Sequence, residues 1–218
     1  MNVILLGPPG SGKGTQGALL ADKLQARPLS TGDLFREILK DPDHPLYPQV
    51  QVIQQGVLVT DDVTNQVVEH GIKKPEYKNG VLFDGYPRTI GQAEALDGIM
   101  AAVGSKVDLI IDLDVTKEVL FYRILGRMLC SNCKKIYHED QGLSHCTDCG
   151  GDLIRRSDDN EETIVQRLKE YRTKTQPLED YYKKNKATFV TVTIDDHTLS
   201  AQEVNQQVVK LLKEKKVI

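Results

Sequence analysis

The sequence predicts an α/β fold in which helices cover a parallel sheet. Three observations indicate this fold: short apolar segments alternate with helical patterns along the 218 residues, helix-start signals follow most of those segments, and a glycine-rich turn joins the first segment to the first helix. Hydrophobic residues make up 39% and charged residues 27% of the chain, which is ordinary for a globular protein with a substantial core.

The individual elements follow from these patterns. Strands are expected at residues 2–6, 28–30, 81–84, 107–113 and 188–194. Helices are expected to begin after Gly12, Thr31, Thr60, Thr89, Thr116, Asp159 and Ser200. Two of these starts have the spacing of a capping box, Thr89 with Gln92 and Ser200 with Glu203. In the last helix one stripe of apolar residues predicts core packing: Val204, Val208, Leu211 and Leu212.

The first apolar segment runs into the turn Gly7-Pro8-Pro9-Gly10-Ser11-Gly12-Lys13-Gly14-Thr15. A strand, a turn of this kind and a helix form the P-loop arrangement, which aims backbone N–H groups and a helix N-terminus at a polyphosphate. Lys13 adds a flexible positive charge for the outer phosphates. Because Gly14 follows Lys13, the hydroxyl stands one position later than usual, at Thr15. We therefore expect Mg²⁺ to be held more by phosphates and water.

Charge and hydropathy exclude several function classes. The formal net charge is −3 and the sequence pI is about 6.0, so nothing indicates binding to nucleic acid or to an anionic membrane. The apolar segment at the N-terminus is too short for a signal peptide or a membrane span. A cytoplasmic location is the expectation, and four cysteines there favour thiols or metal ligands over disulfides.

The four cysteines form two C-x-x-C pairs, Cys130 with Cys133 and Cys146 with Cys149, inside a stretch that interrupts the α/β pattern. Such pairs can place four thiolates around one Zn²⁺. Four protein ligands leave no open position, so this zinc would be structural. A redox dithiol and a pair of disulfides are the alternatives. His138 and His145 could compete as ligands, although an ordinary hydrogen-bonding role is the simpler interpretation.

Several motifs together resemble those of the adenylate kinases, nucleoside-monophosphate kinases of the bacterial type with a zinc-bearing lid. The motifs keep the family's order and spacing over essentially the whole chain. They comprise residues 7–15, 30–33 with Arg36, 58–61, 84–89 with Gln92, 126–127, 156–159, 162–163, 167–168, Tyr171 and 177–178.

The resemblance implies a P-loop NTPase fold with a doubly wound five-stranded parallel sheet of order 2-3-1-4-5 and two mobile inserts. Residues 1–29, 60–125 and 160–218 would form the core, 30–59 an AMP-binding insert and 126–159 the lid over ATP. The implied reaction is reversible, Mg²⁺-dependent transfer of the γ-phosphoryl group of ATP to AMP, which gives two ADP. A monomer is the family expectation.

Phosphoryl transfer depends on positioning and charge neutralisation more than on covalent chemistry. The resemblance assigns this task to Lys13, Arg88, Arg127, Arg156 and Arg167, and it assigns Asp84 to Mg²⁺ through water. It places ATP against Gly10, Ser11, Gly12, Lys13, Gly14, Thr15, Arg123, Arg127, Ile136 and Tyr137. It places AMP against Thr31, Arg36, Val57, Leu58, Val59, Gly85, Tyr86, Pro87, Arg88, Gln92, Arg156 and Arg167.

Several of these assignments have alternatives. Arg123 could form a surface ion pair, Tyr137 could pack inside the lid, and Gln92 could serve only in the capping box. Asp158 and Asp159 could cap the helix that follows, or, as the resemblance implies, hold Lys or Arg groups as the lid closes, or do both.

The chain also departs from the family pattern, and one departure leaves a contact open. Asp196 stands where a glycine often lets the backbone meet the adenine of ATP, so that contact is in doubt. A kinase of CMP or UMP is the nearest alternative function. A P-loop ATPase whose zinc pairs bind nucleic acid is a more distant one, which the acidic balance disfavours.

Overall fold

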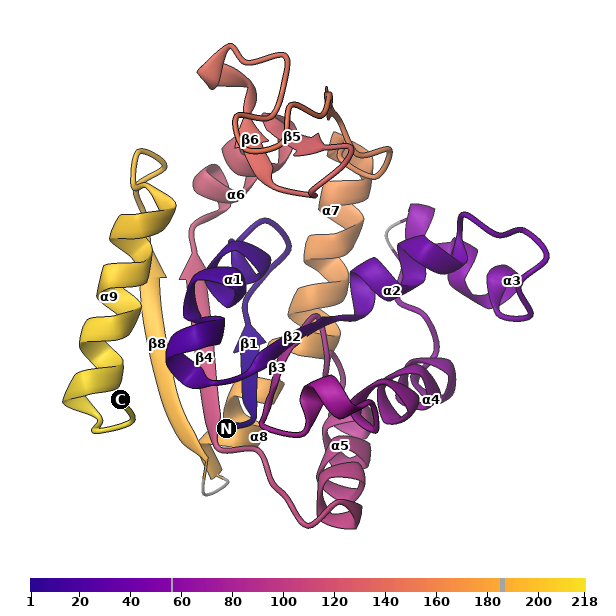
Figure 1. Ribbon diagram of the computed structural model, residues 1–218, viewed down its shortest axis with the longest axis vertical. Helices are drawn as coiled ribbons and strands as arrows, with labels where there is room; N and C mark the ends of the chain where they lie inside the picture. Colours follow the sequence, from indigo (N-terminus) through magenta and orange to yellow (C-terminus); the bar gives the residue numbers. More distant parts are fainter. Residues whose placement is uncertain (56, 185–186) are drawn as a thin grey trace.

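The computed structural model describes residues 1–55, 57–184 and 187–218, and a five-stranded parallel sheet lies at its centre (Figure 1). Its strands are β1 (Val3–Leu6), β2 (Arg27–Ser30), β3 (Val81–Asp84), β4 (Leu109–Val115) and β8 (Thr188–Ile194). They lie in the order β2-β3-β1-β4-β8. Because β8 is the fifth strand of this sheet along the chain, the predicted order 2-3-1-4-5 is confirmed. Strand β4 begins two residues later than predicted, since its pairing with β1 starts at Val3 and Leu109.

Seven helices begin at or next to the predicted positions. They are α1 (Lys13–Leu24), α2 (Thr31–Ile38), α4 (Asp61–Ile72), α5 (Ile90–Ala102), α6 (Lys117–Leu125), α7 (Glu161–Glu170) and α9 (Ala201–Glu214). Two starts were off by one residue because a neighbouring side chain caps the helix. Ser30 caps α2 by accepting from the Asp33 N–H, and Asn160 caps α7 by accepting from the Thr163 N–H at 2.9 Å.

The two predicted capping boxes have different outcomes. At α9, Ser200 and Glu203 exchange both expected hydrogen bonds, so that prediction is confirmed. At α5, the Thr89 hydroxyl accepts from the Gln92 N–H at 3.1 Å, but the Gln92 side chain turns to other partners. The capping box at α5 is therefore only half formed.

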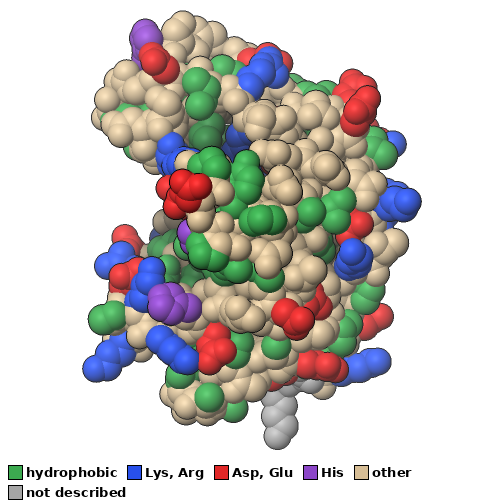
Figure 2. Space-filling view, turned by 90° about the vertical axis from the view of Figure 1, so that its right-hand side faces the viewer, with side chains coloured by type: hydrophobic (Ala, Val, Ile, Leu, Met, Phe, Trp, Pro, Cys, Tyr) green, Lys and Arg blue, Asp and Glu red, His purple; other side chains and the backbone are tan. Residues whose placement is uncertain are grey.

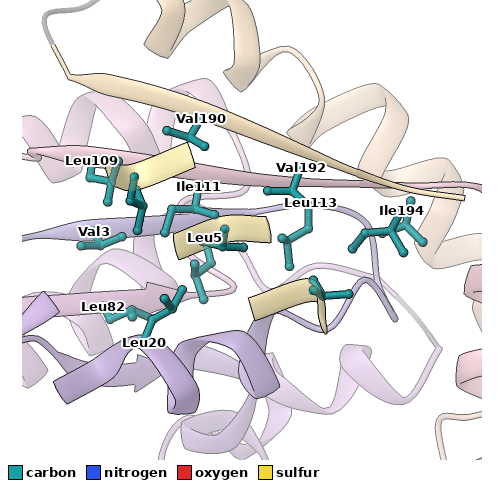
Figure 3. Close-up of a cluster of buried hydrophobic side chains, with 14 of the residues drawn as sticks. Val3, Leu5, Leu20, Leu82, Leu109, Ile111, Leu113, Val190, Val192 and Ile194 are labelled. Atoms are coloured by element: carbon teal, nitrogen blue, oxygen red, sulfur yellow. The ribbon is translucent and has the colours of Figure 1, made fainter. Parts of the chain in front are cut away.

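Both faces of the sheet are covered, which explains why its strands are apolar throughout. Side chains such as Leu5 and Ile111 point toward α1, α6 and α9, and Figure 3 shows them packed with Val192 and Ile194 of β8. Alternate side chains point to the opposite face, where α4, α5 and the short helix α8 (Leu178–Lys184) cover them. This second face includes Ile4 and Ile110. The predicted stripe of α9 is also confirmed, since Val204, Val208 and Leu212 are buried and Leu211 packs against them.

Two segments stand apart from the sheet (Figure 1). After α2, the chain forms α3 (Tyr47–Val50) and the 3-10 helix η1 (Gln51–Gln55). Position 56 of the predicted 30–59 insert lies outside the described residues. Beyond α6, β5 (Arg127–Cys130), β6 (Ile136–His138) and β7 (Leu153–Ile154) form a small antiparallel sheet of order β6-β5-β7, with the 3-10 helix η3 (Glu139–Gln141) after β6.

Two further short elements complete the description: the 3-10 helix η2 (Pro75–Tyr77) and the π-helix η4 (Tyr171–Thr175), which joins α7 to α8. Neither was predicted. Among the helices of the described residues, none combines the length and the apolar character that a membrane span requires.

Candidate active site

The glycine-rich turn after β1 has a backbone that side chains would obstruct. Gly10 has φ +83°, and a Cβ there would lie 2.5 Å from Cγ1 of Ile124. Gly12 precedes α1 at φ 97° and brings no side-chain cap to that helix. The N–H groups at the start of α1 thus face the turn without a capping side chain, which is the arrangement that binds a phosphate.

Lys13 folds back across this turn. Its Nζ donates to the carbonyl oxygens of Gly7 at 2.7 Å and Pro8 at 2.8 Å. Burial lowers the pKa of Lys13 to about 8, although the nearby Asp84 carboxylate opposes that change. The ammonium group is therefore held in a poorly hydrated position, where an anion would gain more from it than in water.

Arginines from separate parts of the chain gather near this turn. Arg88 follows β3, Arg167 lies on α7 and Arg36 lies on α2. Burial lowers the pKa of Arg88 to about 10, and the positive charges of Arg167 and Arg36 lower it further while Asp84 raises it. Arg88 therefore stays protonated at neutral pH. The mutual effect of these arginines shows that the fold concentrates positive charge at one place.

Two aspartates neutralise part of this charge. Asp159 accepts two hydrogen bonds from the Arg127 guanidinium, one of them from Nε at 2.7 Å, and its side chain is only 1% exposed. Asp158 accepts from Arg167 Nη1 at 3.0 Å. Because Asn160 caps α7 instead, the capping alternative for the two aspartates was wrong. Both carboxylates pair with arginines, and their predicted role in closing a lid stays a prediction.

Arg156 lies near these arginines and aspartates, and its own positive charge is less well compensated than theirs. Its Nε is buried and has no hydrogen-bond partner among the residues that the structure describes. Burial lowers the pKa of Arg156 to about 10, and the neighbouring charges of Arg127 and Arg36 act in the same direction. A buried donor without a partner indicates a place where an acceptor is expected to bind.

Asp84 ends β3 beside the start of α1. A Cβ at Gly14 would lie 3.2 Å from Asp84 Oδ2, so the glycine leaves space next to this carboxylate. Oxygen ligands of this kind, together with the Thr15 hydroxyl in the first turn of α1, suit a hydrated Mg²⁺. The donor set therefore fits a hydrated magnesium ion, which Asp84 and Thr15 would help to hold.

A hydrogen-bond network joins residues on the other side of β3. The Thr31 hydroxyl and Arg88 Nε both donate to the Gly85 carbonyl oxygen at 2.8 Å. The Arg88 N–H donates to Gln92 Oε1 at 2.7 Å, and the Tyr86 hydroxyl donates to the Gln92 carbonyl oxygen at 3.1 Å. Five of the residues predicted to bind AMP are thus brought together.

The remaining residues predicted on this side are less closely tied to the network. Arg36 pairs with Asp33 at 2.7 Å on α2, while Val59 is buried and Val57 and Leu58 are half-buried. The Tyr86–Pro87 peptide bond is cis.

Two polar residues in this region were missed by the sequence analysis as site residues. Asp61 accepts from the Thr89 hydroxyl at 2.7 Å and from Gln92 Nε2 at 2.8 Å. Thr175 donates to the Arg88 carbonyl oxygen at 2.8 Å. Asp61 belongs to a motif quoted above, so its position could have been noticed. Thr175 carried no signal, because only the π-helix η4 brings it to Arg88.

Residues predicted near ATP divide between the turn and the small antiparallel sheet. Arg123 Nη1 donates to the Ser11 carbonyl oxygen at 3.2 Å, so it contacts the glycine-rich turn, and it forms no ion pair with any residue that the structure describes. Tyr137 is 7% exposed and its hydroxyl lies 3.2 Å from Cys146 Sγ, which supports a packing role inside the segment of the small antiparallel sheet. Ile136 is exposed, and Asp196 accepts from the Thr198 N–H at 2.8 Å.

The four cysteines come together as the spacing predicted. Their Sγ atoms lie within 4.8 Å of one another, with 3.4 Å between Cys130 and Cys149 and 3.5 Å between Cys133 and Cys146. Zn–S bonds of about 2.3 Å in a tetrahedron would separate the sulfurs by about 3.8 Å. All four are free thiols, so the disulfide alternative is not supported. The cluster fits a zinc ion.

The two histidines have other partners. His138 Nε2 lies 3.1 Å from the Tyr122 carbonyl oxygen, and His145 Nδ1 lies 3.1 Å from Asp152 Oδ1. Neither belongs to a metal-binding group among the described residues, which confirms the ordinary interpretation. Tyr137 supports the cysteine cluster, because its hydrogen bond to Cys146 lowers the pKa of that thiol and so favours the thiolate.

The surface view adds the shape of this region. Figure 2 shows that one side of the molecule is hollowed between an upper lobe and the main body, with Lys and Arg side chains near the hollow. The upper lobe corresponds to the small antiparallel sheet at the top of Figure 1.

Comparisons with known proteins agree with this arrangement. A family model described as Adenylate kinase matches residues 5–187. An adenylate kinase of Thermoanaerobacter sp. (strain X514) is 41% identical over 216 residues, covering 97% of this chain and 98% of that protein. An adenylate kinase of Methanothrix thermoacetophila is 42% identical over 188 residues (84% and 87%), and one of Finegoldia magna is 39% identical over 217 residues (98% and 99%).

The position of Lys13 generates a prediction about its titration. In the nucleotide-free protein, NMR of the Lys13 Nζ should give a pKa near 8, and Asp84→Asn should lower this pKa further because the carboxylate favours the ammonium. A wild-type value near the ordinary 10.5 would contradict the burial argument.

The same shift sets the sign of a stability effect. Since the folded pKa of Lys13 lies below the unfolded one, the unfolded chain binds more protons between about pH 8 and 10.5. As pH rises through this window, the free energy of unfolding of the wild type should therefore increase relative to that of Lys13→Met. Urea unfolding at several pH values measures both.

Proposed function

The chain belongs to the adenylate kinase family and is a nucleoside-monophosphate kinase; on this premise we propose how its residues transfer a phosphoryl group from ATP to AMP. The observation that carries the proposal is the gathering of Lys13, Arg88 and Arg167 from three separate segments, close enough to affect one another's pKa. Such a cluster suits the oxygens of two nucleotides whose phosphates meet end to end.

On the ATP side, the glycine-rich turn and the N-terminus of α1 bind the phosphates through backbone N–H groups. Lys13 leaves the carbonyl oxygens of Gly7 and Pro8 to reach the outer phosphates, and Arg123 lies next to the turn through its bond to Ser11. The other proposed positions are Gly10, Gly12, Gly14, Thr15, Arg127, Ile136 and Tyr137. The structure supports Tyr137 here only as a packing residue of the lid.

On the AMP side, Thr31, Gly85 and Gln92 surround the base, while Arg36 and Arg88 bind the phosphate. The shared hydrogen-bond network supports this assignment, because it holds these groups in one rigid unit. The same proposal includes Val57, Leu58, Val59, Tyr86, Pro87, Arg156 and Arg167. Arginine suits the phosphate contacts because its planar fork binds two oxygens and keeps its proton.

The chemical step asks these residues to position the acceptor oxygen in line with the transferred group and to neutralise the spreading negative charge. Neutralising this negative charge is assigned to Arg88, Arg156 and Arg167. The buried Nε of Arg156 supports the assignment, because it is a donor without a partner among the described residues. Mg²⁺ would supply further neutralisation when bound, and Asp84 is the residue proposed to hold it through water. No covalent intermediate is needed.

The proposed organisation is a core of residues 1–29, 60–125 and 160–218, an AMP-binding insert at 30–59 and a lid at 126–159. The ion pair of Asp158 with Arg167 connects the base of the lid to α7, whereas the pair of Asp159 with Arg127 lies within the lid. Closure of the lid would exclude water and suppress hydrolysis of ATP. A cytoplasmic monomer is proposed on the family resemblance alone.

The lid is proposed to hold a structural zinc ion through Cys130, Cys133, Cys146 and Cys149. A segment of this size builds little hydrophobic core, as the small buried cluster of Cys130, Tyr137 and Cys146 illustrates. Zinc would supply the stability that burial does not.

The proposed function predicts a defined product ratio. Protein mixed with Mg-ATP and AMP should form two ADP for each AMP consumed, measured by anion-exchange chromatography, whereas CMP and UMP should be poor acceptors. ATP without AMP should be hydrolysed slowly, because the closed site excludes water. Preference for CMP or UMP, or rapid hydrolysis of ATP alone, would overturn the assignment.

Removal of zinc should affect stability more than chemistry. Chelation should lower the melting temperature of the protein while turnover at low temperature largely survives, since the cysteine cluster has no open position for substrate. Without chelator, Cys133→Ser should melt at a lower temperature than the wild type. Adding chelator should lower the melting temperature of the variant less than that of the wild type. Immediate loss of turnover with the fold intact would mean that the metal is catalytic.

A further inference from the structure

Asp61, the first residue of α4, connects two helix starts that flank the proposed AMP site. Its Oδ2 accepts from the Thr89 hydroxyl at 2.7 Å, and its Oδ1 accepts from Gln92 Nε2 at 2.8 Å. Helices α4 and α5 pack side by side in Figure 1, so this carboxylate bridges their N-terminal ends. Asp61 also lies two residues after the 57–59 segment.

The two neighbours of the Gln92 amide determine its orientation. A side-chain amide can usually be placed in either of two flipped positions, because its oxygen and nitrogen have similar shapes. Here the Asp61 carboxylate can only accept and the Arg88 N–H can only donate. The amide oxygen must therefore face Arg88, at 2.7 Å, and the amide nitrogen must face Asp61.

Burial makes this orientation difficult to reverse. Gln92 is only 2% exposed, so a flipped amide would set donor against donor and acceptor against acceptor with no water to compensate. After its two bonds to protein, the amide retains one N–H hydrogen and one oxygen lone pair. The identity of the group that points in each direction is thus imposed by Asp61 and Arg88.

We propose that Asp61 is a positioning residue that sets acceptor specificity, because it fixes which groups Gln92 offers to the base. This inference rests on the proposed role of Gln92 at the AMP base. A 6-aminopurine offers a donor at its amino group and an acceptor at N1, whereas a 6-oxopurine offers the reverse pattern. The orientation of one amide therefore distinguishes AMP from IMP.

The test compares Asp61→Asn with Asp62→Asn. Both residues lie in the first turn of α4 and both substitutions remove one negative charge there, but Asp62 is exposed. An asparagine at position 61 that accepts from Thr89 turns its NH₂ toward Gln92 and so favours the flipped amide. We expect the ratio of kcat/KM for AMP to that for IMP to fall about tenfold or more in Asp61→Asn and to stay unchanged in Asp62→Asn.

Two further variants keep the result interpretable. Asp61→Ala removes the acceptor without adding a donor, so selectivity should fall in the same direction by a smaller factor. Gln92→Leu tests the premise: if it keeps the wild-type selectivity, Gln92 does not bind the base and that part of the proposed function fails. If Gln92→Leu loses selectivity while both Asp61 variants, folded by circular dichroism, keep it, the role of Asp61 is overturned. An equal loss of activity toward AMP and IMP would likewise overturn it.

Discussion

The structure depends on one electrostatic constraint, the concentration of positive charge at a partly buried place. Like charges repel more strongly where water is excluded, and the lowered pKa values of Lys13, Arg88 and Arg156 reflect both burial and this repulsion. The fold tolerates the cluster because hydrogen-bond acceptors compensate part of its charge. Lys13 donates to carbonyl oxygens of the turn, Arg167 donates to Asp158 and Arg127 donates to Asp159. A polyanion would relieve what remains of the repulsion.

The parallel sheet explains how such distant residues meet. The carboxyl ends of adjacent parallel strands open at the same edge, and ligands bind there. The ends of β1, β2 and β3 lead respectively into the glycine-rich turn, into Ser30 and Thr31, and into the segment from Asp84 to Arg88. Helix α7 then brings Arg167 to the same edge from the far end of the chain. The order of the parallel strands therefore brings these segments to one edge of the sheet, whichever side chains they carry.

Much of this was predictable because it depends on local patterns. Apolar segments, helix starts and the paired cysteines each carry a signal within a few residues, and the structure confirms them in type and nearly in position. The misses have a shared cause, which is competition between nearby polar groups. Asn160 caps α7 in place of Asp159, because Asp159 is already bound to Arg127.

Long-range contacts set the other limit. Gln92 has the spacing of a capping residue, but Asp61 and Arg88 take its side chain instead, and periodicity cannot reveal partners in other elements. The contact of Thr175 with Arg88 joins residues 87 positions apart through a π-helix that no sequence signal announced. Such contacts decide how a site is held, whereas local motifs decide where it lies.

The most direct measurement is the turnover of a variant in which Lys13 and Arg88 are both replaced by methionine, assayed beside each single variant. Circular dichroism would show that the fold is kept. If both charges act on the transferring phosphoryl group, each single loss should be about 10²–10³-fold and the double variant should be slower still. A folded double variant that forms ADP at the wild-type rate would contradict the account.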